Sequence, residues 1–140
     1  MNEMMTGHCL CKAVDLRLTS HAGGVSACHC AMCRRWSGGA TLCLEAPAAD
    51  VTATGPVQVY RSSHFAERAF CGRCGTHLWI RDDDGDYDLM PGLFDAAAEL
   101  PLLREIYTDR AFACMAFRGD HPRVPAAEHE AGHNHVEGSA

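Results

Sequence analysis

Nine cysteines are the feature that most constrains this chain, because seven of them fall in three tight clusters. The start of the chain, Met1 to Met5, lacks the positive charge and the apolar stretch of a secretory signal. Without export, a disulfide framework is not expected, because the cytosol keeps thiols reduced. Clustered thiols there are typical of metal ligands or redox groups. In chain order the clusters are Cys9-Leu10-Cys11, Cys28-His29-Cys30-Ala31-Met32-Cys33 and Cys71-Gly72-Arg73-Cys74.

The composition is that of a single soluble globular domain. The chain has 140 residues, of which 47% are hydrophobic and 21% charged, and its formal net charge is −6. An acidic balance argues against a nucleic-acid binder, which needs basic residues to neutralise phosphates. No apolar run approaches the roughly 18 residues that cross a bilayer. We therefore expect a cytoplasmic protein with neither nucleic acid nor membrane as a partner.

Short alternating segments separated by turn residues predict a mostly antiparallel β fold. Apolar and polar side chains alternate over residues 14–18, as they do on a half-buried strand. A hairpin is expected around the polar run Asp82 to Asp86. Helical patterning is weak, and only Phe94 to Leu103 fits one or two helical turns. Further strands are expected at 41–45, 57–60 and 104–108.

The end of the chain differs from the rest in composition. From Gly119 onward, prolines, alanines and histidines follow one another without a buried period. We expect residues 1–118 to form the folded domain and residues 119–140 to form a mobile tail. Its histidines, at positions 129, 133 and 135, favour at most weak metal binding.

The first and last cysteine clusters together predict a closed zinc site. The segment Cys71-Gly72-Arg73-Cys74-Gly75 is a knuckle whose glycines let the backbone turn so that its amides face the sulfurs. Zinc prefers four tetrahedral ligands, and the knuckle needs two more. Cys9 and Cys11 can supply them, which would join an early strand to a middle hairpin in a domain with a thin core. The alternative is a set of buried free thiols.

The central cluster differs because it has three cysteines within six residues and no fourth one nearby. Three protein ligands and one open position are typical of catalytic zinc. The open position would take water or a substrate thiol, whose pKa the metal would lower. Two alternatives stay open: the site is closed by His29 or a distant side chain, or the thiols form a metal-free redox group. His29 is an awkward ligand, because it lies between two ligand cysteines and would point away.

Other residues carry weaker signals. Arg34, Arg35 and Ser37 follow the central cluster, and they either bind an anionic ligand at the open site or form a solvated turn. Cys43 and Cys114 lie in apolar surroundings and are expected to be small core residues.

The three clusters, in this order, resemble the glutathione-dependent formaldehyde-activating enzyme family, whose domain is also called CENP-V/GFA. The resemblance extends over about residues 5–118 and leaves the tail uncovered. It rests on the motifs Gly7-His8-Cys9-Leu10-Cys11, Cys28-His29-Cys30-Ala31-Met32-Cys33-Arg34-Arg35-Trp36-Ser37-Gly38 and Phe70-Cys71-Gly72-Arg73-Cys74-Gly75-Thr76-His77-Leu78.

The resemblance implies an all-β fold of the β-tent kind, in which short antiparallel sheets are stapled by zinc. It implies carbon–sulfur lyase chemistry that joins glutathione and formaldehyde into S-hydroxymethylglutathione, or runs in reverse. Near the end of the chain the sequence departs from the family, since Glu105-Ile106 stands where relatives often carry a His-Ile pair. The implied ligands are Cys9, Cys11, Cys71 and Cys74 for a structural zinc, and Cys28, Cys30 and Cys33 for a labile catalytic zinc.

The thiol–aldehyde enzyme is the first of three functional hypotheses. In it the central cluster is catalytic and the arginines that follow hold a carboxylate of the thiol substrate. The second is a zinc scaffold that binds a partner protein or buffers metal, because a fold alone does not decide function. The third is a redox enzyme resembling methionine sulfoxide reductases. It would need a reactive cysteine that is not a metal ligand, and only Cys43 or Cys114 is available for that role.

Overall fold

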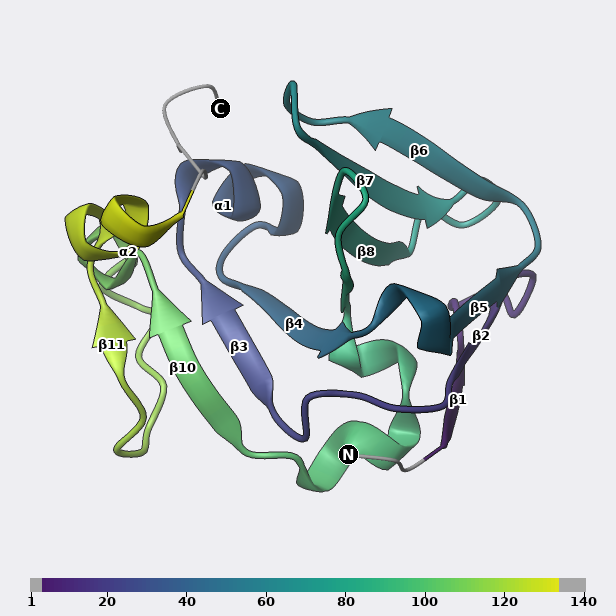
Figure 1. Cartoon of the computed structure of the whole chain (residues 1–140), viewed down its shortest axis with the longest axis horizontal. Helices are drawn as coiled ribbons and strands as arrows, with labels where there is room; N and C mark the ends of the chain where they lie inside the picture. The colour runs from purple at the N-terminus through teal and green to yellow at the C-terminus, as the bar shows by residue number, and fades with distance from the viewer. Residues whose placement is uncertain (1–3, 134–140) are drawn as a thin grey trace. The chain divides into compact units, whose positions relative to one another are not determined.

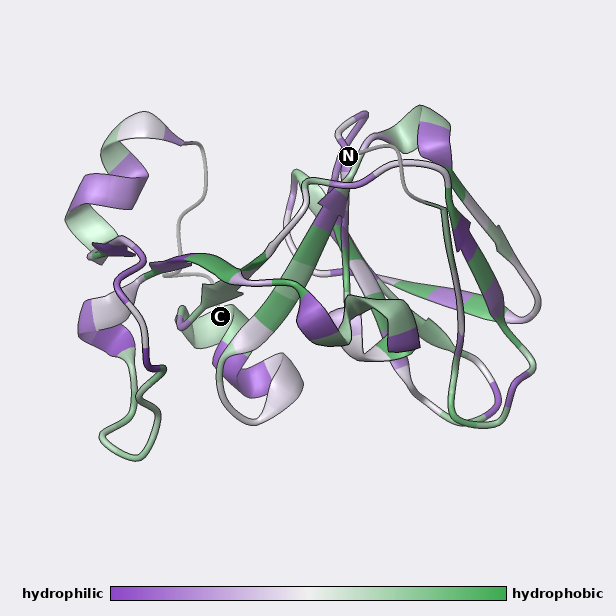
Figure 2. Ribbon diagram, turned by 90° about the horizontal axis from the view of Figure 1, so that it is seen from below, coloured by the Kyte–Doolittle hydropathy of each residue, from purple (hydrophilic) through white to green (hydrophobic). Residues whose placement is uncertain are grey.

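The computed structural model describes residues 4–133 and is built mostly from short strands (Figure 1). The chain divides into two compact units. Among the described residues, the first consists of residues 4–24 and 43–100, and the second of residues 25–42 and 101–133. Some strands alternate hydrophobic and hydrophilic residues along their length (Figure 2), as the sequence pattern over residues 14–18 predicts.

The first unit contains a three-stranded antiparallel sheet. Strand β1 (Met5–His8) pairs with β2 (Asp15–Leu18), and β2 pairs on its other side with β5 (Val51–Thr54). Alternation along β2 buries Leu16 and Leu18 and leaves Asp15 and Arg17 exposed. The strand expected from residues 14–18 is therefore confirmed.

The remaining strands of the first unit run antiparallel in the order β4-β9-β8-β7-β6. The expected hairpin around Asp82 to Asp86 is present, and its two strands are β8 and β9. Three short 3₁₀ helices complete this unit: η1 (Ala48–Asp50), η2 (Pro91–Leu93) and η3 (Asp95–Glu99). The strands are β4 (Thr41–Ala46), β6 (Val57–Arg61), β7 (Ala66–Cys71), β8 (His77–Asp82) and β9 (Tyr87–Leu89).

The core of the first unit includes two cysteines of the predicted metal site. Cys9 and Cys71 are buried in the same cluster as Leu18, Leu44 and Leu78. The loops that carry these two cysteines are therefore anchored in the core.

The second unit has a parallel sheet. Strand β10 (Leu102–Ile106) lies between β3 (Val25–Cys28) and β11 (Arg123–Val124) and runs parallel to both (Figure 1). The mostly-β expectation is confirmed, but the sheets are mixed because the long connection from β3 to β10 returns the chain in the same direction.

Two segments of the second unit carry structure that the sequence patterns did not predict. Helix α1 (Ala31–Ser37) is capped by Cys30 and ends at Gly38, which has a positive φ of 85°. Residues 119–133 include β11 and helix α2 (Ala126–Gly132), and the latter buries Ala126 and His129. The short 3₁₀ helix η4 (Thr108–Arg110) lies between β10 and this segment. His135, which we placed in a tail, lies outside the described residues.

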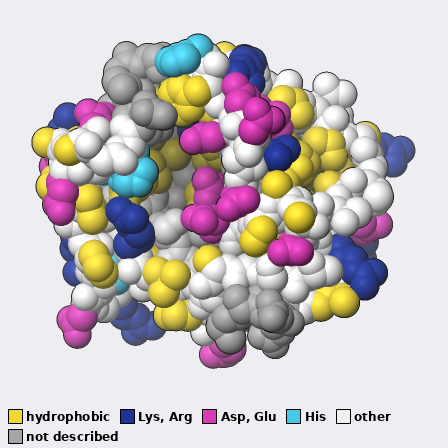
Figure 3. Space-filling model, viewed as in Figure 1, with side chains coloured by type: hydrophobic (Ala, Val, Ile, Leu, Met, Phe, Trp, Pro, Cys, Tyr) yellow, Lys and Arg dark blue, Asp and Glu magenta, His cyan; other side chains and the backbone are white. Residues whose placement is uncertain are grey.

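Among residues 4–133, no helix is both long and apolar enough to cross a membrane. Acidic side chains are prominent on the face drawn in Figure 3, in keeping with the net charge of −6.

Candidate metal centres

The first and last cysteine clusters meet in the first unit. The sulfurs of Cys9, Cys11, Cys71 and Cys74 all lie within 4.8 Å of one another. The Cys11 sulfur is 3.6 Å from that of Cys9 and 3.8 Å from that of Cys71. Two thiolates at about 2.3 Å from one tetrahedral zinc lie roughly 3.8 Å apart. The four sulfurs therefore fit a zinc ion.

Local backbone turns hold these sulfurs in place. In the loop after β1, the Val14 amide donates to the Cys9 sulfur at 3.3 Å, while the Cys9 amide donates to the Val14 carbonyl at 3.1 Å. In the knuckle, the Arg73 amide donates to the Cys71 sulfur at 3.4 Å, and Gly75 turns the chain with a φ of 79°. The amides thus face the sulfurs and offset negative charge, as the glycine pattern predicted.

Thr76 ties the two halves of the four-cysteine site together. Its hydroxyl lies 3.1 Å from the Cys74 sulfur and accepts a hydrogen bond from the Leu10 amide, also at 3.1 Å. Hydrogen bonds from the Thr76 hydroxyl and amide lower the pKa of Cys74 to about 5. The Ala13 amide favours the thiolate of Cys11, but desolvation and the neighbouring thiols outweigh it and raise the pKa of Cys11 to about 11. A cation is needed before all four thiols can ionise together.

The central cluster forms a second group of thiols in the second unit. The sulfurs of Cys28, Cys30 and Cys33 lie within 4.8 Å of one another, and all three residues are buried. Cys28 ends β3, and the Cys30 sulfur accepts a hydrogen bond from the Cys33 amide at 3.4 Å, which caps α1. The first turn of α1 thus brings Cys33 back over Cys30. The Cys30 and Cys33 thiols, together with burial, raise the pKa of Cys28.

This second donor set also fits a metal ion. Three buried thiols in contact disfavour ionisation of one another, and a divalent cation among them reverses that preference. His29 is engaged elsewhere, because its Nε2 lies 2.7 Å from Oε1 of Glu105. Among the described residues, His29 belongs to neither group of potential ligands.

The family model described as glutathione-dependent formaldehyde-activating enzyme matches residues 4–110. The chain belongs to this family. A lyase of Schizosaccharomyces pombe, named as uncharacterized, is 34% identical to this family member over 116 residues, which cover 79% of this chain and 83% of that protein.

Two further relatives are more distant. A protein of Halomonas elongata, provisionally named as a glutathione-dependent formaldehyde-activating enzyme, is 29% identical over 89 residues, or 56% of this chain and 57% of its own. A crystal structure of a Rhodobacter sphaeroides protein shares the fold with a TM-score of 0.56 and 21% identity, covering 70% of this chain and 99% of that one.

The three polar residues after the central cluster, Arg34, Arg35 and Ser37, have different surroundings. The Arg34 guanidinium lies 5.0 Å from the centre of the Phe112 ring, and both residues line a narrow cleft of the second unit. Arg35 is exposed, and the Ser37 hydroxyl is 2.7 Å from that of Thr41. The cleft is lined by His29, Arg34, Gly39, Ala40, Arg110, Phe112 and Met115.

The two cysteines outside the clusters differ from each other. Cys43 is buried, as expected. Cys114 is exposed, so the expectation of a core position for it is wrong. It lies in residues 111–122, which form no strand or helix, and the apolar residues around it do not fold over it.

Sequence reasoning missed a buried carboxylate beside the second thiol group. The side chain of Glu105 is 5% exposed, and it contacts His29, His121 and Arg123. Burial alone would raise the pKa of Glu105, but the hydrogen bonds from His121 and His29 hold it below its usual value. The available signal was a single acidic residue near the start of the expected strand 104–108.

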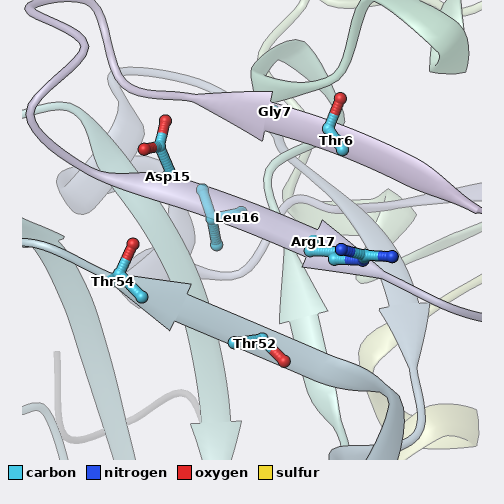
Figure 4. Close-up of a pocket in the computed structure, with 7 residues that line it drawn as sticks. All are labelled: Thr6, Gly7, Asp15, Leu16, Arg17, Thr52 and Thr54. Carbon is cyan, nitrogen blue, oxygen red and sulfur yellow. The ribbon is translucent and has the colours of Figure 1, made fainter.

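The first unit also carries an open pocket on the three-stranded sheet (Figure 4). Its volume is about 380 Å³, and it contains none of the predicted site residues. It is lined by Thr6, Gly7, Asp15, Leu16, Arg17, Thr52 and Thr54. This is the polar outer face that alternation along β2 produces.

Proposed function

We propose that this protein is a carbon–sulfur lyase that acts on the adduct of a thiol and a small aldehyde, such as S-hydroxymethylglutathione from glutathione and formaldehyde. The observation that supports it is the buried group Cys28, Cys30 and Cys33, which is separate from the four-cysteine site in a member of this family. Among the described residues, this group offers three ligands rather than four. Its ligand number is that of catalytic zinc sites.

In this proposal the two thiol groups have different roles. Cys9, Cys11, Cys71 and Cys74 would hold a structural zinc inside the core of the first unit. Cys28, Cys30 and Cys33 would hold the second zinc. When bound there, zinc would supply Lewis acidity that favours the thiolate form of a substrate thiol near neutral pH. Reduced thiol clusters of this kind suit the cytoplasm, where we place the protein.

The reaction needs positioning more than it needs covalent chemistry from the protein. The thiol sulfur attacks the carbonyl carbon and forms the C–S bond, while the carbonyl π bond breaks and the thiol proton ends on the new hydroxyl oxygen. The reverse reaction breaks the same C–S bond and releases thiol and aldehyde. Holding the two small molecules together removes much of the entropic barrier.

We assign to Arg34 the binding of the thiol substrate. Its guanidinium is held over Phe112 at the cleft, one helical turn from Cys30 on α1. A guanidinium in that position can form a bidentate contact with a carboxylate such as those of glutathione. The exposed position of Arg35 gives it no comparable contact.

Exchange NMR on a mixture of glutathione and formaldehyde tests the proposal, with the spontaneous reaction as baseline. We expect faster exchange with the zinc-loaded protein and with Cys114→Ser, whose thiol is exposed and outside both groups. Cys33→Ser should return the rate to the baseline while the fold stays intact. A baseline rate with fully loaded wild-type protein would contradict the proposal and favour a zinc scaffold without chemistry.

A further inference from the structure

Two buried side chains of β10 and its C-terminal extension, Glu105 and Tyr107, bind the segment that follows residue 118. Oε2 of Glu105 lies 2.5 Å from Nε2 of His121 and 3.2 Å from Nε of Arg123. The His121 side chain is 4% exposed and that of Glu105 is 5% exposed. The Glu105–His121 contact is therefore shielded from water, unlike the surface ion pairs that contribute little, whereas the Arg123 side chain is 44% exposed.

Tyr107 makes the second link. It has no exposed surface, and its hydroxyl donates to Oε2 of Glu130 on α2 at 2.7 Å. The Tyr107 ring also packs against His129 of the same helix, with ring centres 5.5 Å apart. Tyr107 has a positive φ of 56°, which costs energy for an aromatic residue and persists only where its surroundings hold it.

The residue between these two links is adjacent to the three-cysteine group. Ile106 pairs with Cys28 in the register of β10 and β3, and its carbonyl accepts a hydrogen bond from the His29 amide at 3.1 Å. The second carboxylate oxygen of Glu105, Oε1, accepts a hydrogen bond from Nε2 of His29 at 2.7 Å. Movement of Ile106 away from β3 would therefore loosen the segment that carries Cys28 and Cys30.

The partners on α2 and β11 all lie beyond residue 110, where the match to the family model ends. We propose that residues 119–133 form a clamp that keeps the three-cysteine group closed around its metal, with Glu105 and Tyr107 as positioning residues. The inference rests on the metal site of the proposed function. It adds that the retention of this metal is set by a C-terminal segment rather than by the three thiols alone.

The clamp would slow the release of metal from the three-cysteine group. Metal leaves a site of three thiolates when the ligand-bearing segments separate, and contacts behind the ligands oppose that separation. Loss of a group that hydrogen-bonds a metal ligand typically weakens a metal site about 10- to 100-fold, and for these more distant contacts we expect the lower end of that range. The four-cysteine group lies in the other unit and makes no use of these contacts.

The test uses metal release from the full-length protein loaded with Co²⁺, followed by its thiolate absorption after addition of excess chelator. The variants are Tyr107→Phe, Glu130→Ala and the double variant, with Glu128→Ala as the matched control, since Glu128 is exposed on the same helix. Cys33→Ser identifies the release phase of the three-cysteine group. The phase of the four-cysteine group serves as the internal reference.

We expect each single variant to release metal from the three-cysteine group about 10-fold faster, and the double variant to match the singles, because all three remove the same contact. The control and the reference phase should not change. Release within twofold of wild type, or acceleration of both phases together, would overturn the clamp. If wild type shows no phase that Cys33→Ser removes, the second metal site itself is wrong, and the proposed function fails with it.

Discussion

The sulfur of Cys11 lies 3.8 Å from the sulfur of Cys71, although 60 residues separate the two in the chain. Cys71 ends β7 and Cys11 follows β1, so a shared metal ion would join two parts of the first unit that are distant in sequence. Because Cys9 and Cys71 are part of the buried cluster, the metal would also be linked to the core. Binding free energy at such a site is folding free energy.

Substitution of a knuckle ligand should therefore unfold the first unit. We expect Cys71→Ser to lower the free energy of unfolding by about 4 kcal/mol or more, in the range that loss of a structural metal produces. Thermal unfolding followed by circular dichroism, with bound zinc counted on the same sample, checks this. Cys114→Ser is the control and should melt like wild type, since its thiol is exposed. If Cys71→Ser and wild type unfold at the same temperature, the four-cysteine site has no structural role.

Packing next to β1 supplies a second prediction. A Cβ at Gly7 would lie 2.4 Å from the carbonyl oxygen of Leu93 and 2.7 Å from the Phe94 ring. Gly7→Ala should therefore cost about 1–3 kcal/mol of stability, as overpacking does. Gly92→Ala is the matched control, because a Cβ there meets nothing within 4 Å. Urea denaturation of both variants tests the difference, and equal midpoints would show that β1 adjusts without cost.

The cysteine spacing predicted the three-cysteine group because its ligands are local, and the four ligands that zinc prefers predicted the pairing of the other two clusters. The glycines of the knuckle allow its tight turn, with Gly75 at a φ of 79°, and this turn brings the sulfurs of Cys71 and Cys74 together. The strand at 14–18 was predictable for the same reason, since its alternation is a local pattern.

The contacts of Glu105 and Tyr107 could not be predicted in this way. Their partners His121 and Glu130 lie in a segment whose composition is typical of a tail, and only packing against β10 and η4 gives it structure. Helix α1 was missed because its seven residues are too few for a helical period, and its caps, Cys30 and Gly38, read as parts of the cysteine motif.

The pH dependence of α2 follows from Asp109. The Ala126 amide at the start of α2 donates to Oδ1 of Asp109 at 2.7 Å, and this bond holds the pKa of Asp109 below its usual value. The unfolded carboxyl titrates near pH 3.9. Because the folded pKa is lower, the stabilisation is complete above about pH 4 and is lost as the pH falls through the folded pKa.

Hydrogen exchange of the α2 amides should therefore accelerate below pH 4 relative to the intrinsic rate. In Asp109→Asn the α2 amides should exchange faster already at neutral pH, and the acid-dependent step should disappear. Asp95→Asn, at the start of η3 in the first unit, is the control. If the acceleration of exchange below pH 4 persists in Asp109→Asn, the titration of another group causes it.

The assignment of Arg34 to the thiol substrate gives a kinetic prediction. If its guanidinium binds a carboxylate of glutathione, Arg34→Ala loses a charged hydrogen bond worth roughly 1.5 kcal/mol or more, which raises KM about 10-fold. Arg35→Ala is the matched control one residue away on the exposed side of α1 and should leave KM unchanged. Steady-state exchange rates at varied glutathione concentration provide both values. A neutral thiol such as 2-mercaptoethanol has no carboxylate, so the two variants should not differ with it. If Arg34→Ala lowers the rate equally with both thiols, Arg34 does not bind the carboxylate. Its contact with the Phe112 ring would then stabilise the shape of the cleft instead.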